Sequence, residues 1–257
     1  MNTAPISIIT VCYNAENSIE KTILSVIDQS LRGIEYLIVD GASTDGTLKI
    51  IEKYQGRITK VISEKDDGLY DAMNKGLSLA TGDYVLFLNA DDTLYAADTM
   101  EEVFNSCNEA DVIYGEAMIV NESGKELGLR SVRTPHKVPE NLTWKSLRWG
   151  MVVSHQAFII RRSLALPYDL QYRVCADIDW MIRCLKQCKS ICNSREIICN
   201  FRAGGTSHRN EKLAWKERYQ IFNKHYGIVN NFINHILISL RYLIHKRMQR
   251  SKKQKNL

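Results

Sequence analysis

Asparagine and aspartate side chains follow four short apolar runs in the first hundred residues of the chain. They include Asn14, Asp40, Asp66 and Asp91, each just beyond the end of one run. If the runs are parallel strands, these residues lie at the edge of the sheet where open α/β sheets bind their ligands. The sequence therefore predicts one crevice lined by hydrogen-bond acceptors.

Asn89-Ala90-Asp91-Asp92 is the most concentrated of these polar segments. Carboxylate and amide oxygens are ligands that suit Mg²⁺ and Mn²⁺. A substrate diphosphate would complete the coordination. The alternative is structural, because this kind of segment also forms good turns and helix N-caps.

Two further segments can face the same crevice. Asp40 opens a loop that ends at Gly46, so its carboxylate can accept hydrogen bonds from a base or a ribose, and the next helix N-terminus would favour an anion. A well-capped turn is the alternative. Asp71 and Lys75 are four residues apart on a predicted helix, which fits either an ion-paired surface or a stripe that faces a ligand.

Asp177 and Asp179 lie just before or within the first turn of a predicted helix. A carboxylate that faces the crevice can act as a general base. Acidic residues in a first turn also offset the helix dipole, and this is the alternative. His155 precedes a predicted strand, where it either lines a substrate pocket or forms structural hydrogen bonds.

The chain has seven cysteines, an odd number. No signal peptide is evident at the N-terminus, so we expect reduced thiols and a cytosolic protein. Cys184, Cys188 and Cys192 recur every four residues but lack the C-x2-C spacing of zinc sites. Small buried hydrophobic residues are therefore the preferred interpretation.

Strand and helix patterns alternate through the first half of the chain. The pattern predicts strands over 6–11, 34–39, 58–63, 84–88, 112–114, 157–160 and 194–201, and helices over 18–31, 48–54, 69–80, 100–107 and 178–187. Hairpins and loops are expected over 121–150. This order predicts an α/β fold with a mostly parallel central sheet flanked by helices.

The last fifty residues differ from the rest in charge. Residues 206–257 hold 12 Lys and Arg against two Asp and Glu, whereas the preceding residues carry a net charge of −5. An acidic body argues against nucleic acid as a partner. Apolar residues from Ile228 to Ile244 recur at helical spacing, so the end of the chain is expected to form an amphipathic helix. That helix would contact an anionic membrane surface, the protein core or a second subunit.

Four segments in register resemble the family 2 glycosyltransferases of the GT-A fold. They are Ile8-Ile-Thr-Val-Cys-Tyr-Asn14, Val39-Asp-Gly-Ala-Ser-Thr-Asp-Gly-Thr47, Ser63-Glu-Lys-Asp-Asp-Gly-Leu-Tyr-Asp-Ala-Met-Asn-Lys-Gly76 and Thr81-Gly-Asp-Tyr-Val-Leu-Phe-Leu-Asn-Ala-Asp-Asp92. Weaker resemblance continues to Ser207. The resemblance implies a GT-A domain over 1–205, with a nucleotide-sugar half (1–100) and an acceptor half (101–205), followed by a basic helical extension over 206–257.

The resemblance also implies a reaction. The enzyme would be an inverting hexosyl- or N-acetylhexosaminyltransferase that moves a sugar from a nucleotide-diphospho-sugar, with UDP as the first choice, to a glycan or polyprenyl-linked acceptor in surface polysaccharide biosynthesis. It would act in the cytoplasm or at the cytosolic face of the membrane, with Mn²⁺ or Mg²⁺ as the cofactor.

Each site residue takes its expected role from a matching position. Asp177 matches the catalytic base, with Asp179 as its rival, and His155 lies on the acceptor side. Asp91 matches the main metal-linked carboxylate, and Asn89 stands where the family has the first Asp of Asp-x-Asp. The expected nucleotide-sugar ligands are Thr10, Tyr13, Asn14, Asp40, Asp66, Asn74, Lys75, Asn89 and Ala90.

Two other functions remain open at this point. A nucleotidyltransferase that makes sugar nucleotides would use a similar sheet and cation, but residues 10–18 offer no basic, Gly-rich phosphate loop. A degenerate sugar-nucleotide binding module is suggested by Asn89 and by Ala176, which replaces the Glu often found before the base. The retained Asp91 and Asp177 argue against it.

Overall fold

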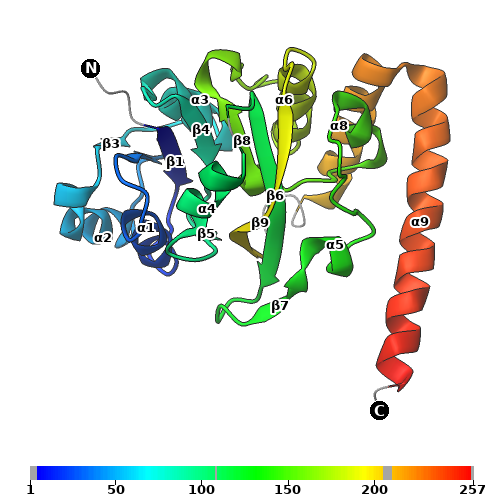
Figure 1. The fold of residues 1–257 in the computed structure, drawn as a ribbon, viewed down its shortest axis with the longest axis horizontal. Coiled ribbons are helices and arrows are strands. Elements are labelled where there is room, and N and C mark those ends of the chain that lie inside the picture. The colour runs from blue at the N-terminus through cyan, green and yellow to red at the C-terminus, as the bar shows by residue number, and fades with distance from the viewer. Residues whose placement is uncertain (1–4, 108, 205–209, 256–257) are drawn as a thin grey trace.

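A computed structural model describes residues 5–107, 109–204 and 210–255 (Figure 1). The first half alternates strands and helices, as the apolar pattern predicts. Its elements are β1 (Ile6–Cys12), α1 (Ile19–Ile27), β2 (Glu35–Asp40), α2 (Thr47–Lys53), β3 (Lys60–Ser63), α3 (Leu69–Leu79) and β4 (Tyr84–Phe87).

The second half is less regular and contains longer strands. Its elements are β5 (Thr93–Leu94), α4 (Thr99–Ser106), β6 (Val112–Val120), β7 (Glu126–Leu129), α5 (Arg130–Arg133), β8 (Phe158–Arg161), α6 (Ala176–Leu185) and β9 (Ile191–Arg202), with short 3-10 turns η1 (Gln55–Arg57), η2 (Trp144–Trp149), η3 (His155–Ala157) and η4 (Arg162–Leu164). Two helices, α8 (Glu211–Tyr226) and α9 (Ile228–Lys255), follow.

The strands of the described residues form a single sheet in the order β3-β2-β1-β4-β8-β6-β9-β5, with β7 beside β6. The strands from β3 to β4 are parallel to one another. Beyond β4 the sheet is mixed, because β8 runs antiparallel to both β4 and β6. The predicted α/β class is confirmed, and the parallel part of the sheet is the part that ends in the polar segments.

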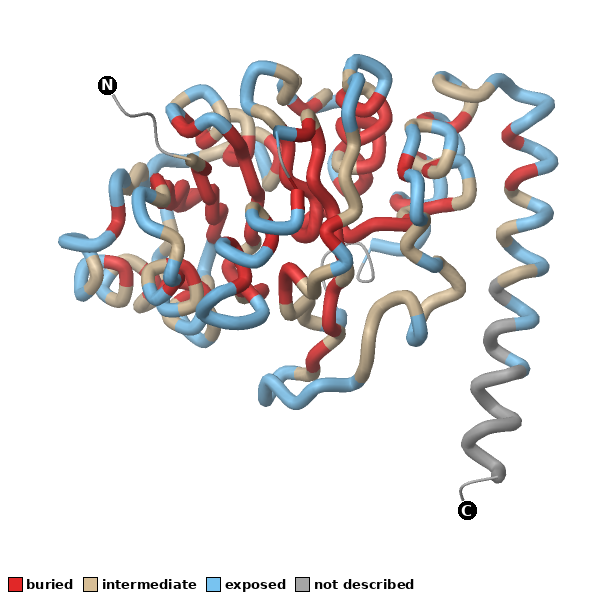
Figure 2. The backbone as a smooth tube through the Cα atoms, in the orientation of Figure 1, coloured by how far each residue is buried: buried red, intermediate tan, exposed pale blue. Residues whose placement is uncertain are grey.

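Two hydrophobic cores cover the two faces of the sheet. Alternate residues of a strand point to opposite faces. Ile9 and Val39 therefore join the core beneath α3 and α6, while Ile8 and Ile38 join the core beneath α1 and α4. Both faces are buried along β1, β2 and β4, so these strands read as continuous apolar runs rather than as alternating ones, whereas the edge strand β3 is partly exposed (Figure 2).

Several element boundaries differ from the predictions. α1 ends at Ile27 instead of running to Leu31. β6 and β9 are longer than predicted, since they pair with each other over nearly their whole length. Antiparallel pairing of β6 with β7 confirms a hairpin within the predicted loop region.

One cysteine prediction is wrong. Cys107 at the end of α4 and Cys192 on β9 form a disulfide, with their Cα atoms 5.9 Å apart. The pair is 85 residues apart in sequence, so only the tertiary structure brings the two thiols together. The other five cysteines are free. Cys192 does not share a helix with Cys184, because α6 ends at Leu185.

The helix α9 lies along one side of the body, where it contacts α8 through its polar face (Figure 1). Asn231 is buried there, and its amide donates hydrogen bonds to the carbonyl of Tyr219 and to the side-chain oxygen of Asn223. The opposite face carries exposed apolar residues, namely Ile228, Val229, Phe232, Ile233, Ile236, Leu237, Leu240, Leu243 and Ile244. No helix in the described ranges is both long and apolar enough to cross a membrane.

Candidate active site

Asp40 is fixed at the end of β2 by its own neighbours. It is fully buried, and its carboxylate accepts hydrogen bonds from the backbone N–H of Ser43 (3.0 Å), the hydroxyl of Ser43 and the hydroxyl of Ser63 (2.7 Å). The Cys12 thiol lies 3.6 Å from the same carboxylate. The strand ends of β1, β2 and β3 therefore meet at this one carboxylate.

The loop after β1 is tied to the loop after β2. Asn14 adopts a positive φ of 49°, and its side-chain oxygen accepts a hydrogen bond from the N–H of Thr44 (2.9 Å). Tyr13 beside it is 64% exposed, so its ring is available to stack on a planar ligand. Thr10 is different: it is fully buried, and its hydroxyl lies 3.2 Å from the hydroxyl of Tyr36. The Thr10 hydroxyl is thus engaged with Tyr36 in this structure, and its contact with a nucleotide stays a prediction.

Asp66 reaches the same edge from the loop after β3. A Cβ atom at Gly41 would lie 2.4 Å from a carboxylate oxygen of Asp66, so Gly41 is what lets the two loops approach. The other oxygen of Asp66 accepts a hydrogen bond from the N–H of Gly68 (2.8 Å) just before α3. The structure thus brings Asp66 next to the end of β2, as the motif spacing predicts.

Asn74 and Lys75 make contacts within the protein instead of facing open space. The Asn74 amide donates to the carbonyl of Tyr168 and accepts from its N–H, at 3.0 and 2.7 Å. Lys75 pairs with Glu64 (2.9 Å) and Asp71 (3.4 Å). The ion-paired alternative for Asp71 and Lys75 matches these contacts, and donor contacts of Asn74 and Lys75 stay a prediction.

The segment Asn89-Ala90-Asp91-Asp92 divides into exposed and buried residues. Asp91 is exposed, whereas Ala90 and Asp92 are buried. Burial and the neighbouring Asp91 raise the pKa of Asp92 well above its usual range. Asp92 also accepts a hydrogen bond from the N–H of Arg202 (2.8 Å), which joins the segment to β9. Asp91 is consequently the carboxylate of this segment that can meet a ligand.

The donor atoms of this segment suit a hard divalent cation. The buried side-chain oxygen of Asn89 has no hydrogen-bond partner among the described residues, and the Asp91 carboxylate is exposed two positions later. One amide and one carboxylate are a small oxygen set, of the kind that binds Mg²⁺ or Mn²⁺ when phosphates and water supply the rest. In the described part of the chain, no cluster of three or more His, Cys, Asp or Glu forms a closed metal cage.

Asp177 lies in the first turn of α6, where it is partly buried. Its Oδ1 accepts hydrogen bonds from the N–H of Ile178 (2.9 Å) and from the hydroxyl of Tyr70 (3.2 Å) on α3. Burial raises the pKa of Asp177 to about 6, although these hydrogen bonds and the nearby Arg218 act in the opposite direction. A carboxylate with this pKa is ionised at neutral pH and is still basic enough to accept a proton.

Asp179 is fully buried and belongs to an ion-pair network. Its carboxylate contacts Arg183 Nε (2.5 Å), His225 Nε2 (2.8 Å) and Lys224 Nζ (3.3 Å). Burial alone would raise its pKa, but the hydrogen bonds from His225 and Arg183 hold the pKa well below the usual range. Asp179 therefore joins α6 to α8, and its role as a rival base stays a prediction.

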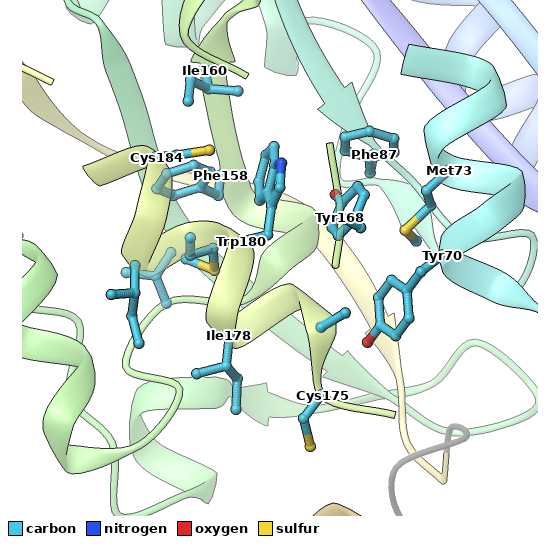
Figure 3. Packing of buried hydrophobic residues seen from close by; sticks show 14 of the residues in the cluster. Tyr70, Met73, Phe87, Phe158, Ile160, Tyr168, Cys175, Ile178, Trp180 and Cys184 are labelled. Atoms are coloured by element: carbon cyan, nitrogen blue, oxygen red, sulfur yellow. The ribbon is translucent and has the colours of Figure 1, made fainter. Parts of the chain in front are cut away.

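His155 lies inside an aromatic cluster beneath α6. Its Nε2 is 2.7 Å from the hydroxyl of Tyr168, and its ring stacks on Phe87 at 5.5 Å. Burial lowers the pKa of His155 to about 3, so the imidazole is neutral. Figure 3 shows Phe87, Tyr168 and Trp180 within this cluster and Tyr70 at its edge, near the start of α6. These contacts match the structural alternative for His155, and its acceptor-side role stays a prediction.

Contacts link Asp177 to the ends of the parallel strands. Tyr70 holds Asp177 and belongs to the first turn of α3, and the loop before α3 carries Asp66, which lies against Gly41. Asp40 directly precedes Gly41 in this chain of contacts. This chain of contacts connects the Asp177 carboxylate of α6, through α3 and the loop before it, to the ends of the parallel strands.

Several residues of this region lack a signal in the sequence. Tyr70, Glu217 and Arg218 surround the start of α6, yet none of them belongs to a segment that predicts a role there. Tyr70 lies inside the segment from Asp66 to Gly76, and its place in the first turn of α3 is the one available hint. Glu217 and Arg218 come from α8, more than thirty residues after Asp177.

The sequence and the fold match those of known proteins. Residues 7–166 match the family model described as "Glycosyl transferase family 2". A "PGL/p-HBAD biosynthesis glycosyltransferase" of Mycobacterium bovis is 35% identical over 187 residues, which cover 69% of this chain and 68% of the relative.

Two solved structures share the fold. The "Crystal structure of S. aureus TarS 1-349 in complex with UDP-GlcNAc" has a TM-score of 0.68 and 20% identity; the match covers 92% of this chain but only 66% of that one. The "Mannosyltransferase PcManGT from Pyrobaculum calidifontis in complex with GDP-Man and Mn2+" has a TM-score of 0.64 and 16% identity, with 96% of this chain and 74% of that chain covered.

Proposed function

The chain is a member of glycosyl transferase family 2, and we propose that it transfers a sugar from a nucleotide-diphospho-sugar to an acceptor hydroxyl with inversion at the anomeric carbon. The observation that carries this proposal is the position of Asp177. This carboxylate has a pKa of about 6 and is linked through Tyr70 and the loop before α3 to the polar ends of the parallel strands.

Asp177 is the general base of the proposed reaction. Both hydrogen bonds of its side chain reach Oδ1, so Oδ2 is the oxygen that we expect to take the proton of the acceptor hydroxyl. The deprotonated hydroxyl then attacks the anomeric carbon on the face opposite to the diphosphate. Attack from that face inverts the anomeric centre. A positioned general base contributes about 10²–10⁴-fold to such a step.

The donor occupies the ends of β1, β2 and β3 in this proposal. The exposed ring of Tyr13 stacks on the nucleobase, while Asp40 and Asp66 fix the loops that surround the nucleoside. We assign donor binding to residues 1–100 and acceptor binding to 101–205. A uridine diphospho-sugar is the first candidate, and the structural neighbours, one with UDP-GlcNAc and one with GDP-Man, support a nucleotide-sugar of this general kind.

Asp91 and Asn89 are the residues that would hold Mn²⁺ or Mg²⁺. A divalent cation bound there would offset the negative charge that the diphosphate gains as it leaves. Asp91 supplies the charge, and the unpaired amide oxygen of Asn89 supplies a neutral ligand. The buried Asp92 and its bond to Arg202 hold the backbone of this segment in position.

The surface of helix α9 is evidence that the acceptor is located at a membrane surface. Its exposed apolar face is unusual for a helix whose polar residues, such as Asn231 and Asn234, are buried against the body. Residues 206–257 also carry a net charge of +10. We therefore propose peripheral contact with an anionic, cytosolic membrane face, where a polyprenyl-linked or other glycan acceptor of surface polysaccharide synthesis would be located.

The reaction is tested with a panel of UDP-, GDP- and dTDP-sugars, each assayed for hydrolysis and transfer with and without Mn²⁺. We expect one nucleotide to be preferred and the metal to be required. Asp177→Asn should lower turnover about 10²–10⁴-fold while the donor still binds. Normal turnover by Asp177→Asn would remove Asp177 from the mechanism, and pyrophosphate release from a nucleoside triphosphate and a sugar phosphate would replace the proposal by a nucleotidyltransferase.

The membrane contact is tested by flotation with vesicles of phosphatidylcholine, with and without phosphatidylglycerol. The double variant Ile236→Asp/Leu240→Asp should lose binding to the anionic vesicles, while Ser239→Asp on the same helix adds one charge and serves as the control. Equal binding of both variants, or a dimer in sedimentation that the double variant abolishes, would contradict the membrane proposal.

A further inference from the structure

We propose that Glu217, a buried carboxylate on α8, positions the base Asp177 by holding the backbone that leads into α6. This inference rests on the proposed role of Asp177. It assigns a function in the reaction to the helix α8, which belongs to the basic extension and not to the segments that resemble the family.

Glu217 binds three consecutive backbone N–H groups. Its Oε1 accepts a hydrogen bond from Arg173 (2.8 Å), and its Oε2 accepts hydrogen bonds from Val174 and Cys175 (both 2.9 Å). Glu217 is only 4% exposed. Hydrogen bonds to a charged, buried acceptor are the strong ones, so this carboxylate fixes the segment firmly.

The segment needs this support because α6 lacks a local cap. The N-terminal N–H groups of a helix have no partner within the helix. Cys175 occupies the N-cap position of α6 and makes no side-chain capping bond. Glu217 therefore binds the residues immediately before the helix from a different element, and Asp177 follows two positions after Cys175.

Tyr70 holds the same segment from the opposite direction. Its hydroxyl lies 3.0 Å from the carbonyl of Val174 and 3.2 Å from Oδ1 of Asp177. Val174 is thus bound through its N–H by Glu217 and through its carbonyl by Tyr70. Because the Tyr70 hydroxyl contacts both Val174 and Asp177, a displacement of Val174 would also weaken the contact between Tyr70 and Asp177.

Four other groups complete the surroundings of Asp177. Tyr70 comes from α3, Arg218 from α8, and the Cys175 thiol from the start of α6, while Tyr168 lies farther into the aromatic cluster. Tyr70 and Arg218 favour the ionised form of Asp177. If the segment loosens, Asp177 loses contact with Tyr70, and the pKa of the base should rise.

The test compares Glu217→Gln with Glu217→Asp and with Glu211→Gln, a variant of an exposed carboxylate at the start of the same helix. The amide of Glu217→Gln places N–H donors against backbone N–H groups. We expect its kcat to fall about 10²-fold because a base displaced by about 1 Å loses this much rate. The KM for the donor should stay within about twofold of the parent value, since the donor loops are untouched. The acidic midpoint of the kcat profile should move above 6, Glu217→Asp should recover part of the rate, and Glu211→Gln should behave as the parent enzyme.

Thermal unfolding is measured for every variant, and the assays are run well below the lowest melting temperature. If Glu217→Gln does not fold, Glu217→Asp carries the test, because its shorter carboxylate keeps the charge but is too short to hold all three N–H groups at the parent distances. A smaller fall in kcat and a smaller upward shift of the pH midpoint are then expected.

Two outcomes would overturn the inference. One is a folded Glu217→Gln enzyme, or a folded Glu217→Asp enzyme where the former does not fold, with the parent kcat and pH midpoint. The other is a parallel change of kcat and donor KM at an unchanged midpoint, which indicates a general structural role. Turnover that survives Asp177→Asn would instead contradict the proposed function, so the two failures are distinguishable.

Discussion

The donor side and the base side of the site are built in different ways. At the donor side, Asp40 is held by Ser43 and Ser63, which belong to the same motif-bearing loops. At the base side, Asp177 is held by Tyr70, which is 107 residues away in sequence. The donor side is therefore assembled from short segments that can be recognised in the sequence. The surroundings of Asp177, by contrast, depend on the packing of α3, α6 and α8 against one another.

The two aspartates of α6 show the same contrast over two residues. Asp177 is partly exposed and has a raised pKa, while Asp179 is fully buried and has a lowered one. The proposed base has no ion pair at hydrogen-bond distance among the described residues, which suits a carboxylate that is to accept a proton. The carboxylate that joins the helices is paired with Arg183, Lys224 and His225.

The largest expected effect comes from breaking the buried network. Asp179→Asn should lower the free energy of unfolding by about 3–5 kcal/mol, because Arg183 and Lys224 would lose their buried partner. Asp177→Asn should act in the opposite direction. Its folded pKa of about 6 lies above the ordinary value of 3.8, so the ionised form opposes folding at neutral pH and its removal should add about 1–2 kcal/mol.

Urea unfolding of both variants at pH 7 measures whether the two substitutions change the free energy of unfolding in opposite directions. Circular dichroism serves as the signal, and the parent chain is the reference. Destabilisation by both substitutions to a similar extent would show that the two carboxylates are not distinguished in the way that the structure indicates.

A smaller effect is expected at the donor side. Asp40→Asn keeps one acceptor oxygen but turns an amide toward the donors of Ser43 and Ser63. The free energy of unfolding should fall by about 1.5–3 kcal/mol, the range for hydrogen bonds to a charged group. Donor affinity should fall as the loop loosens, and the pH midpoint of turnover should stay near 6, because Asp177 lies on the other side of the site.

Donor affinity is measured by calorimetry with the preferred nucleotide, and Asp67→Asn, an exposed carboxylate in the next loop, is the control. A shifted pH midpoint in Asp40→Asn would indicate that the two sides are coupled more tightly than their separate contacts suggest.

The smallest effect is the pH dependence of the parent enzyme. Asp177 must be ionised to accept a proton, so kcat should fall about tenfold for each pH unit below a midpoint near 6 and level off above it. Stability should change in the opposite sense, since the protonated form of Asp177 is the one that folding favours. A profile without an acidic limb would exclude Asp177 as the titrating base.

The part of the site that the sequence predicts consists of residues placed by their own strands. Asp40, Asp66 and Asp91 each follow a strand of the parallel sheet, and strand ends meet at one edge by the geometry of that sheet. Thr10 and His155 belong to equally suggestive segments, but burial gives them structural contacts. The type and spacing of a residue do not predict whether other elements will bury its side chain.

The alternation of strands and helices, the order of the polar segments and the amphipathic character of the last helix can be predicted from the chain alone, because each depends on residues that are close in sequence. Packing between distant elements sets which carboxylate of α6 escapes the ion-pair network, and it brings Glu217 to the start of that helix, Cys107 to Cys192 and the apolar face of α9 outward. These outcomes depend on contacts across 40 or more residues or on packing between whole elements. Such contacts form when the helices close over the sheet, and hydrophobic periodicity within one element carries no information about the partner that another element will bring.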